Sequence, residues 1–290
     1  MLHYLFSFLL LANLNFLPLQ NNGAEFNSVD LLQVNRIPVR QAETLAPVID
    51  AKAGIVMDAH SGIILYEKNP HHPLPMASLT KIMVAVLILD THDLDEIVTV
   101  KDDYYNVEGV KIGLRKGEQM TIRNLLTGLL VRSGGDAALA LASYHSGSVD
   151  QFIETMNQKG KTLHLLNTQF KNPIGLDEDG HYASVFDLAM LTKYALRYPE
   201  FRRIVRLPSA EIFSVNGAIS HHFYSTNKLL GSYLNIVGVK TGTTDAAGES
   251  VINLARGAQN QEIIAVLLNS PDRFQENKQL IDWSFRNYFW

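Results

Sequence analysis

The sequence has 290 residues, of which 47% are hydrophobic and 19% are charged, and its formal net charge at neutral pH is −4. A chain of this length and apolar content can bury a sizeable core in one large domain or two small ones, and its slightly acidic balance excludes a basic protein that coats nucleic acid. The chain contains no cysteine, which excludes disulfides, thiolate zinc ligands and thiol nucleophiles.

The first 24 residues are predicted to be a signal peptide or an N-terminal anchor. Residues 2–19 carry no Asp, Glu, Lys or Arg, and a polar stretch follows them, as in an export signal. Asn13, Asn15 and Pro18 make the stretch a poor transmembrane helix, and a buried N-terminal helix is the alternative. We expect an exported protein, periplasmic or on the extracellular face of the cytoplasmic membrane, with any membrane tether in these residues.

The rest of the chain divides into a spacer and one folded domain. Residues 25–51 are predicted to be the spacer, because Pro38 and Pro47 interrupt them and no periodicity is sustained. The folded domain is predicted over residues 52–290. No internal repeat interrupts it.

The folded domain begins with strand signals that lead into a helix. Two β-rich runs, 53–59 and 62–68, flank a turn at His60 and Ser61 and predict a hairpin. A proline-rich stretch follows, and then residues 78–90 are almost continuously apolar. A helix that is apolar on all sides belongs in a protein core or a membrane, and this one is too short to cross a bilayer. We therefore place it in the core.

The middle of the chain is predicted to be helical, and the end returns to strands. Helices are predicted over residues 121–132, 137–145, 151–166 and 184–198, and strands over residues 234–239, 249–255 and 262–269. Asp136 is the expected N-cap of the second helix, Pro199 is expected to end the fourth, and an amphipathic helix closes the chain. This order predicts an α+β fold, in which both ends of the chain build one antiparallel sheet with flanking helices and a helical insertion.

Ser78 and Lys81 form the first candidate catalytic pair. A serine hydroxyl is a poor nucleophile at neutral pH and needs a nearby base, and residues three apart on a helix share a face. Lysine is a poor base at its ordinary pKa of about 10.4, but burial lowers that pKa. The apolar run 82–89 would bury Lys81, and the start of the helix directs backbone amides toward Ser78, which suits an oxyanion.

Spacing alone does not establish this pair. A helix N-cap with a lysine that reaches solvent explains the spacing more simply. The same S-x-x-K spacing recurs at Ser225 and Lys228, where no long apolar helix follows, and we treat that copy as background. The pair therefore needs support from elsewhere in the chain.

Two further motifs supply that support. Lys240, Thr241 and Gly242 follow a strand-like run. Their cation and hydroxyl can hold a substrate carboxylate, and the glycine lets a substrate backbone approach closely. Ser133 precedes two glycines, and its hydroxyl could relay a proton to a leaving group. The plainer interpretations are a turn with a solvated lysine and an interhelical loop.

Together the three motifs resemble the S-x-x-K, S-x-N and K-T-G set of penicillin-binding proteins and class A β-lactamases. The stretches MASLTKIM, LLVRSGGDAALALA, NPIGLDEDGHYAS and VGVKTGTTDAAG are similar to those of the low-molecular-weight penicillin-binding proteins, the D-alanyl-D-alanine carboxypeptidase/endopeptidase family. The resemblance runs from about Ala53 to the C-terminus. It implies the β-lactamase/transpeptidase-like fold, with residues 52–290 as a catalytic domain. The implied activity is that of a serine-type D-alanyl-D-alanine carboxypeptidase acting on peptidoglycan stem peptides.

The resemblance also implies catalytic roles and partners. Ser78 would form the acyl-enzyme, Lys81 would accept its proton, and Ser133 would assist proton transfer. No cofactor and no metal are implied. The expected partners are a stem peptide ending in D-Ala-D-Ala and β-lactams as covalent inhibitors, with no nucleic acid.

The substrate-binding residues that the resemblance implies are Lys240, Thr241, Gly242 and Thr243. Lys240 and Thr241 would bind the terminal carboxylate of the peptide. The backbone amides of Ser78 and Thr243 would form the oxyanion hole.

The sequence departs from the family pattern in two places. Gly135 stands where the family usually has Asn, whose side chain binds a substrate amide and helps to position the lysine. Its loss is expected to weaken peptide or β-lactam binding by on the order of 1–3 kcal/mol if its partners stay unpaired. The chain also ends soon after Lys240, and this shorter plan resembles the endopeptidase branch.

Three alternatives stay open. A D,D-endopeptidase would use the same acyl-enzyme and differ in its leaving group. A class A-like β-lactamase needs a Glu in an E-x-x-x-N context to activate the deacylating water, and no such spacing lies between Ser133 and Lys240. A non-catalytic penicillin-binding sensor remains an alternative because of Gly135.

Other hydrolase designs find little support. The sequence has no G-x-S-x-G elbow and no H-E-x-x-H motif. His71 and His72, like His221 and His222, are adjacent, and neighbours on a strand or helix do not face one site. We expect these histidines at the surface or in loops, and no zinc site.

Overall fold

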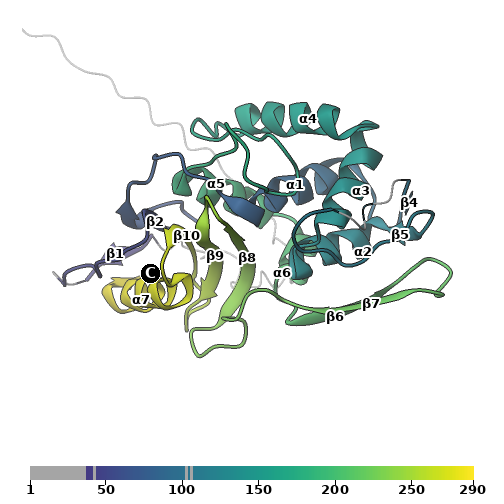
Figure 1. Ribbon diagram of the computed structural model, residues 1–290. Coiled ribbons are helices and arrows are strands. Elements are labelled where there is room, and N and C mark those ends of the chain that lie inside the picture. Colours follow the sequence, from purple (N-terminus) through teal and green to yellow (C-terminus); the bar gives the residue numbers. More distant parts are fainter. Residues whose placement is uncertain (1–36, 42–43, 102–103, 105–106) are drawn as a thin grey trace, which may run out of the picture. The chain divides into compact units, whose positions relative to one another are not determined.

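The computed structural model describes residues 37–41, 44–101, 104 and 107–290. The predicted signal peptide or anchor lies outside these residues. The domain is α+β and is built around one antiparallel sheet with the strand order β3-β2-β10-β9-β8. Figure 1 shows β2, β10, β9 and β8 side by side in this sheet. The strands are β2 (Ala53–Asp58), β3 (Ile64–Lys68), β8 (Ile236–Thr244), β9 (Gly248–Arg256) and β10 (Glu262–Ser270). Two strands come from the beginning of the domain and three from its end, so the predicted sheet built from both ends is confirmed.

The helical insertion lies between β3 and β8, and a further helix follows β10. The α-helices are α1 (Lys81–Thr91), α2 (Ile122–Thr127), α3 (Gly135–Ser146), α4 (Val149–Thr162), α5 (Val185–Ala195), α6 (Pro199–Val205) and α7 (Arg273–Asn287). In the part of the chain that the structure describes, no helix has both the length and the apolar character needed to cross a membrane.

Two helix boundaries differ from the sequence prediction. Asp136 lies inside the first turn of α3, whose N-cap is Gly134. The Asp136 carboxylate instead accepts hydrogen bonds from the backbone of residues 112–114. Pro199 begins α6, because the first helical position needs no intrahelical N–H.

The two faces of the sheet bury separate apolar clusters, because side chains alternate along a strand. Along β10, Ile264 and Val266 pack in one cluster with residues of α1 and α5. Ala265 and Leu267 pack in the other cluster with Leu280 of α7. The sheet thus lies between α7 on one face and the helical insertion on the other, and the helix that carries Lys81 lies in the core as predicted.

Three small sheets were not predicted. They pair β1 (Val39–Arg40) with β11 (Tyr288–Phe289), β4 (Ile97–Thr99) with β5 (Gln119–Thr121), and β6 (Ser209–Phe213) with β7 (Ser220–Tyr224). β1 comes from the segment predicted to be a spacer, and Ile49 in the same segment is buried. The described end of that segment therefore packs onto the folded domain.

The prediction that the paired histidines lie at the surface is wrong for His221. Alternation along β7 turns His221 inward and leaves His222 exposed. The His221 Nε2 atom lies 2.7 Å from a Glu118 carboxylate oxygen, and its Nδ1 atom lies 3.0 Å from the carbonyl oxygen of Ile112. The buried pair fastens the β6–β7 hairpin to the segment that precedes β5.

Candidate active site

Ser78 lies in a tight turn at the start of α1. The 3₁₀ turn Ala77–Thr80 precedes the helix, and Ala77 has a φ of 49°, a conformation that residues with a side chain rarely adopt. The Thr80 hydroxyl donates a hydrogen bond of 2.7 Å to the Ala77 carbonyl. Lys81 follows, and its Nζ atom lies 2.9 Å from the Ser78 Oγ atom. The two side chains meet as their spacing predicts.

The Lys81 amine is buried without a direct acidic partner among the described residues. Only 2% of the residue is exposed, and its amine also donates to the Ile174 carbonyl. Burial lowers the pKa of Lys81 to about 7, although the negative charge of Asp136 partly opposes that shift. The amine is therefore neutral in a large fraction of molecules near pH 7 and can accept a proton.

A second buried cation, Lys240, lies on β8. Its amine donates a hydrogen bond of 2.9 Å to the Thr241 carbonyl, and the described residues offer it no carboxylate. Burial lowers its pKa well below the usual value, and the positive charges of Lys81 and Arg273 lower it further. An anion that entered this site would favour the charged form of Lys240 and so raise its pKa.

Gly242 brings β8 against the nucleophile turn. A Cβ atom at Gly242 would lie 2.9 Å from the Ser78 backbone nitrogen and 2.9 Å from the Ala77 Cβ atom. The sequence favoured a glycine here because a substrate backbone could approach it. The close approach that the structure shows is to the chain's own backbone, and it places K-T-G beside Ser78.

Ser133 is buried at the end of a π-helical turn, Gly128–Arg132, and adopts a left-handed conformation with a φ of 72°. Among the described residues it makes no direct hydrogen bond with Ser78 or Lys81. The second S-x-x-K copy also lies near K-T-G, because the Thr241 hydroxyl donates to the Thr226 hydroxyl at 2.7 Å. Its Lys228 is exposed, so it lacks the burial that lowers the pKa of Lys81.

Comparisons with known proteins show the family of this chain. The family model described as D-alanyl-D-alanine carboxypeptidase, peptidase S11, matches residues 40–272. The chain belongs to the S11 family of D-alanyl-D-alanine carboxypeptidases. The S11 relative DacF of Bacillus subtilis is 34% identical over 249 residues, which are 82% of this chain and 63% of DacF. For Escherichia coli DacC, the identity is 36%, over 83% of this chain and 62% of DacC. This S11 chain therefore spans less than two thirds of the length of these relatives.

Solved structures confirm the transpeptidase-like fold of this S11 chain. The Streptomyces K15 DD-transpeptidase is 28% identical, with a TM-score of 0.78 over 84% of this chain and 100% of that chain. The penicillin binding protein 6B of Escherichia coli is 35% identical, with a TM-score of 0.74 over 83% of this chain and 78% of that chain.

Arg273 of this S11 chain also lies at the site, and the sequence analysis missed it. It is the first residue of α7, and its guanidinium donates to the Gly242 carbonyl at 2.8 Å and to the Thr243 hydroxyl. Its Nε atom lies 3.9 Å from a Glu249 oxygen. No local pattern marked this arginine, because its partners lie on a strand that precedes it by some thirty residues.

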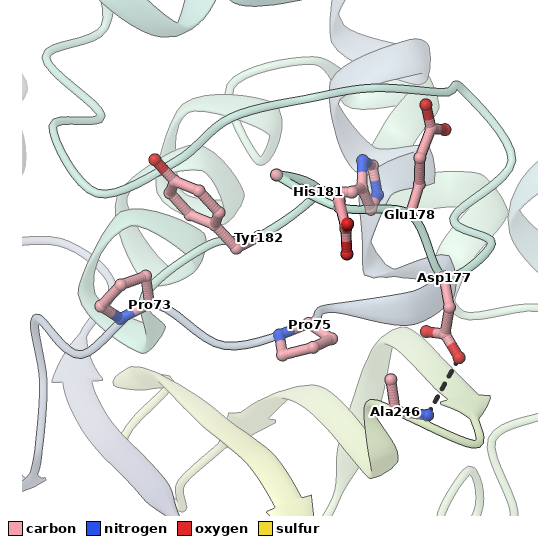
Figure 2. Close-up of a pocket in the computed structure, with 9 residues that line it drawn as sticks. Pro73, Pro75, Asp177, Glu178, His181, Tyr182 and Ala246 are labelled. Carbon is pink, nitrogen blue, oxygen red and sulfur yellow. Dashed lines mark hydrogen bonds between the residues drawn. The ribbon is translucent and has the colours of Figure 1, made fainter.

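The loop 172–182 also lies at the site, which the sequence did not predict, although this stretch formed part of the family resemblance. It bridges α1 and the turn after β8. Asp177 accepts hydrogen bonds from the Thr244 hydroxyl and from the Ala246 amide, at 2.6 and 2.9 Å, and Figure 2 shows the second. A cavity of about 510 Å³ opens beside this loop. Its lining comprises Pro73, Pro75, Asp177, Glu178, Asp179, Gly180, His181, Tyr182 and Ala246.

Proposed function

We propose that this chain is a serine-type D-alanyl-D-alanine carboxypeptidase that acts on peptidoglycan stem peptides through an acyl-enzyme. The observation that carries the proposal is the 2.9 Å contact between the Ser78 hydroxyl and a buried Lys81 amine with a pKa of about 7. Membership of the S11 family supports it, and so do the relatives that are named D-alanyl-D-alanine carboxypeptidases.

The acylation step follows from that contact. The Ser78 proton passes to the Lys81 amine while the Ser78 oxygen bonds to the carbonyl carbon of the peptide. The bond from that carbon to the terminal D-alanine nitrogen then breaks, and the nitrogen takes up a proton. We assign Ser133 to this proton transfer. Water then hydrolyses the ester, which releases the shortened peptide and restores Ser78.

Lys240 is proposed to recognise the carboxylate of the terminal D-alanine, with the Thr241 hydroxyl beside it. Charge-assisted hydrogen bonds to a carboxylate are strong, and the buried Lys240 amine has no acidic partner among the described residues. Gly242 allows the close approach of β8 to Ser78. The backbone amides of Ser78 and Thr243 are proposed to stabilise the oxyanion.

The cavity beside the loop 172–182 is proposed to receive the remainder of the stem peptide. Its volume of about 510 Å³ lies in the range of small-molecule sites, roughly 300–1,000 Å³. Because β-lactams would acylate the same serine, they are proposed to be covalent inhibitors. An exported location is proposed from the substrate, with the tether or signal predicted in residues 1–24. Residues 52–290 are proposed to be the catalytic domain.

The experiment incubates the protein with a synthetic pentapeptide, a crosslinked peptide dimer and a penicillin. Release of terminal D-alanine from the pentapeptide and a penicilloyl adduct on Ser78, located by mass spectrometry, are the expected results. Cleavage of the dimer alone would identify an endopeptidase, and rapid release of opened penicillin would identify a β-lactamase. An adduct without turnover of any substrate would identify a sensor.

The chain supplies its own matched control. Ser78→Ala and Lys81→Ala should each abolish turnover. Ser225→Ala and Lys228→Ala change the second S-x-x-K copy and should leave turnover unchanged. Turnover that survives Ser78→Ala would refute the assignment.

A further inference from the structure

We propose that His181 is a positioning residue for Lys81: through Thr80 it fastens the loop whose Ile174 carbonyl holds the Lys81 amine. This inference rests on the proposed function, because it concerns the residue assigned there as the base. The hydrogen-bond partners of the His181 ring are Thr80 and Lys171, so its effect on Lys81 is indirect.

The hydrogen bonds around His181 fix which ring nitrogen carries the proton. The Lys171 backbone N–H donates to the His181 Nδ1 atom at 2.9 Å, so Nδ1 must be the acceptor. The Nε2 atom lies 2.8 Å from the Thr80 Oγ1 atom. The Thr80 hydroxyl already donates to the Ala77 carbonyl, so we assign the proton to Nε2, which donates to Thr80.

This chain of bonds joins the nucleophile turn to the loop. His181 belongs to the loop, and Thr80 immediately precedes Lys81 in the sequence. Both His181 and Thr80 are buried, where a hydrogen bond has little competition from water. A displacement of the loop therefore breaks a buried polar contact next to the reacting pair.

The opposite side of the same loop presents the Ile174 carbonyl to Lys81. The Asn172 side-chain oxygen accepts from the backbone amides of Gly175 and Leu176, at 2.7 and 3.1 Å, and so fixes the peptide that follows Ile174. Besides Ser78, Ile174 is the partner to which the Lys81 amine donates. A fixed loop therefore holds the Ile174 carbonyl in place as a hydrogen-bond partner of the Lys81 amine.

The composition of the second motif explains why this contact matters here. Gly135 has no side chain to offer Lys81, and the loop fills the space beside it. The Ile174 Cγ2 atom would lie 3.7 Å from a Cβ atom at Gly135, and Val107 Cγ1 would lie 3.7 Å from it as well. Gly135 can give Lys81 no side-chain hydrogen bond, whereas the Ile174 carbonyl accepts one from it.

His181 itself stays neutral at working pH. Burial lowers its pKa to about 4, with a further lowering by Lys81, while the negative charges of Glu178 and Asp177 oppose that shift. The ring therefore acts by its fixed hydrogen bonds rather than by titration. Loosening the loop would admit water to Lys81, and since burial is the main cause of that lowered pKa, the pKa of Lys81 would rise.

Two matched pairs of variants test the proposal. His181→Gln can keep a hydrogen-bond donor near the position of Nε2, so the bond to Thr80 can form. His181→Asn can keep an acceptor near the position of Nδ1 but loses the hydrogen bond to Thr80. Thr80→Ser keeps the hydroxyl, and Thr80→Val removes it. For each variant we would measure the rate constant of acylation by a fluorescent penicillin across pH 5–10, together with the thermal midpoint.

The expected result is a split within each pair. His181→Asn and Thr80→Val should slow acylation by at least about tenfold, as misplaced catalytic groups do, and should move the acid limb of the pH profile to higher pH. His181→Gln should acylate faster than His181→Asn, and Thr80→Ser should stay close to the wild type in both measurements. If His181→Asn does not fold, the Thr80 pair decides alone.

The proposal is overturned if the variants that lose the link acylate with the wild-type pH profile, or if both members of each pair lose only thermal stability. Failure of the acyl-enzyme assignment has a different signature, because the wild-type protein would then form no adduct on Ser78. A sensor or an endopeptidase would still form that adduct, so the acylation rates of the variants would still test the role of His181.

Discussion

Gly175 lies so close to Ala77 that a Cβ atom on Gly175 would stand 2.2 Å from the Ala77 carbonyl oxygen. The φ of Gly175 is 82°, which a residue with a side chain adopts at a cost of roughly 1–2 kcal/mol. The loop that holds Lys81 therefore rests directly on the backbone that carries Ser78, and only glycine permits that contact.

Gly175→Ala is expected to slow acylation by at least about tenfold, because the loop must move away from the nucleophile turn. Gly135→Ala is the control. Its Cβ atom would meet neighbours only at 3.4 Å or beyond, and Gly135 lies in a helix, so the variant should acylate normally and gain about 0.4–1 kcal/mol of stability. Equal acylation rates in the two variants would contradict the close packing of the loop.

The lowered pKa of Lys81 predicts a dependence of stability on pH. Between about 7 and 10.5 the unfolded chain binds a proton at this residue that the folded chain does not. The free energy of unfolding should therefore rise with pH in this window, by up to about 1.4 kcal/mol per pH unit from this group. The destabilisation by Lys81 is complete below the window and absent above it.

Lys81→Met tests this dependence, since the variant keeps most of the length of the side chain without the amine. Urea unfolding of both proteins from pH 7 to pH 10 should show the difference in stability shrinking as pH rises. A difference that stays constant over this range would mean that the amine is not selectively neutral in the folded protein.

The lowered pKa of Lys240 predicts that a carboxylate ligand binds together with a proton. A carboxylate beside the Lys240 amine favours the charged form of the amine and raises its pKa. At a pH above the pKa that Lys240 has in the free protein, ligand binding should therefore take up protons. Calorimetric titration of the Ser78→Ala variant in buffers of different ionisation enthalpy measures that uptake. A peptide with a C-terminal amide is the matched ligand, and uptake that is equal for both peptides would argue against Lys240 as the carboxylate site.

The buried pair of His221 and Glu118 predicts a large effect on stability. Removal of one member leaves a buried polar group without its partner, which costs about 1–3 kcal/mol. His221→Phe should therefore lower the free energy of unfolding by about 1–3 kcal/mol. The adjacent His222 is exposed, so His222→Phe should leave stability within about 0.5 kcal/mol of the wild type. Similar losses in the two variants would show that the pair is not what holds the hairpin.

Much of the framework followed from short stretches of sequence. Short apolar runs bounded by turn residues predicted several elements of the fold. These are the hairpin of β2 and β3, the buried helix after Ser78, and the strands β8, β9 and β10. The contact of Ser78 with Lys81 was predictable for the same reason, because residues one helical turn apart must lie on one face.

The remaining site residues come from segments that are distant in the sequence. Arg273 reaches β8 from the last helix, and Ile174 reaches Lys81 from a loop some ninety residues away. The surface prediction for His221 was wrong because its burial depends on Glu118, which is distant in the sequence. The hydrophobic periodicity of a segment does not predict its contacts with distant segments.

The sequence by itself determined which groups are available: a hydroxyl and an amine one helical turn apart, and a lysine next to a strand-like run. Only the tertiary structure decided their chemistry. Burial of Lys81 and Lys240 by distant segments lowers their pKa values, and the loop resting on Ala77 supplies a partner for the amine. The physical reason is that desolvation depends on everything packed around a charge, which no short window of sequence contains.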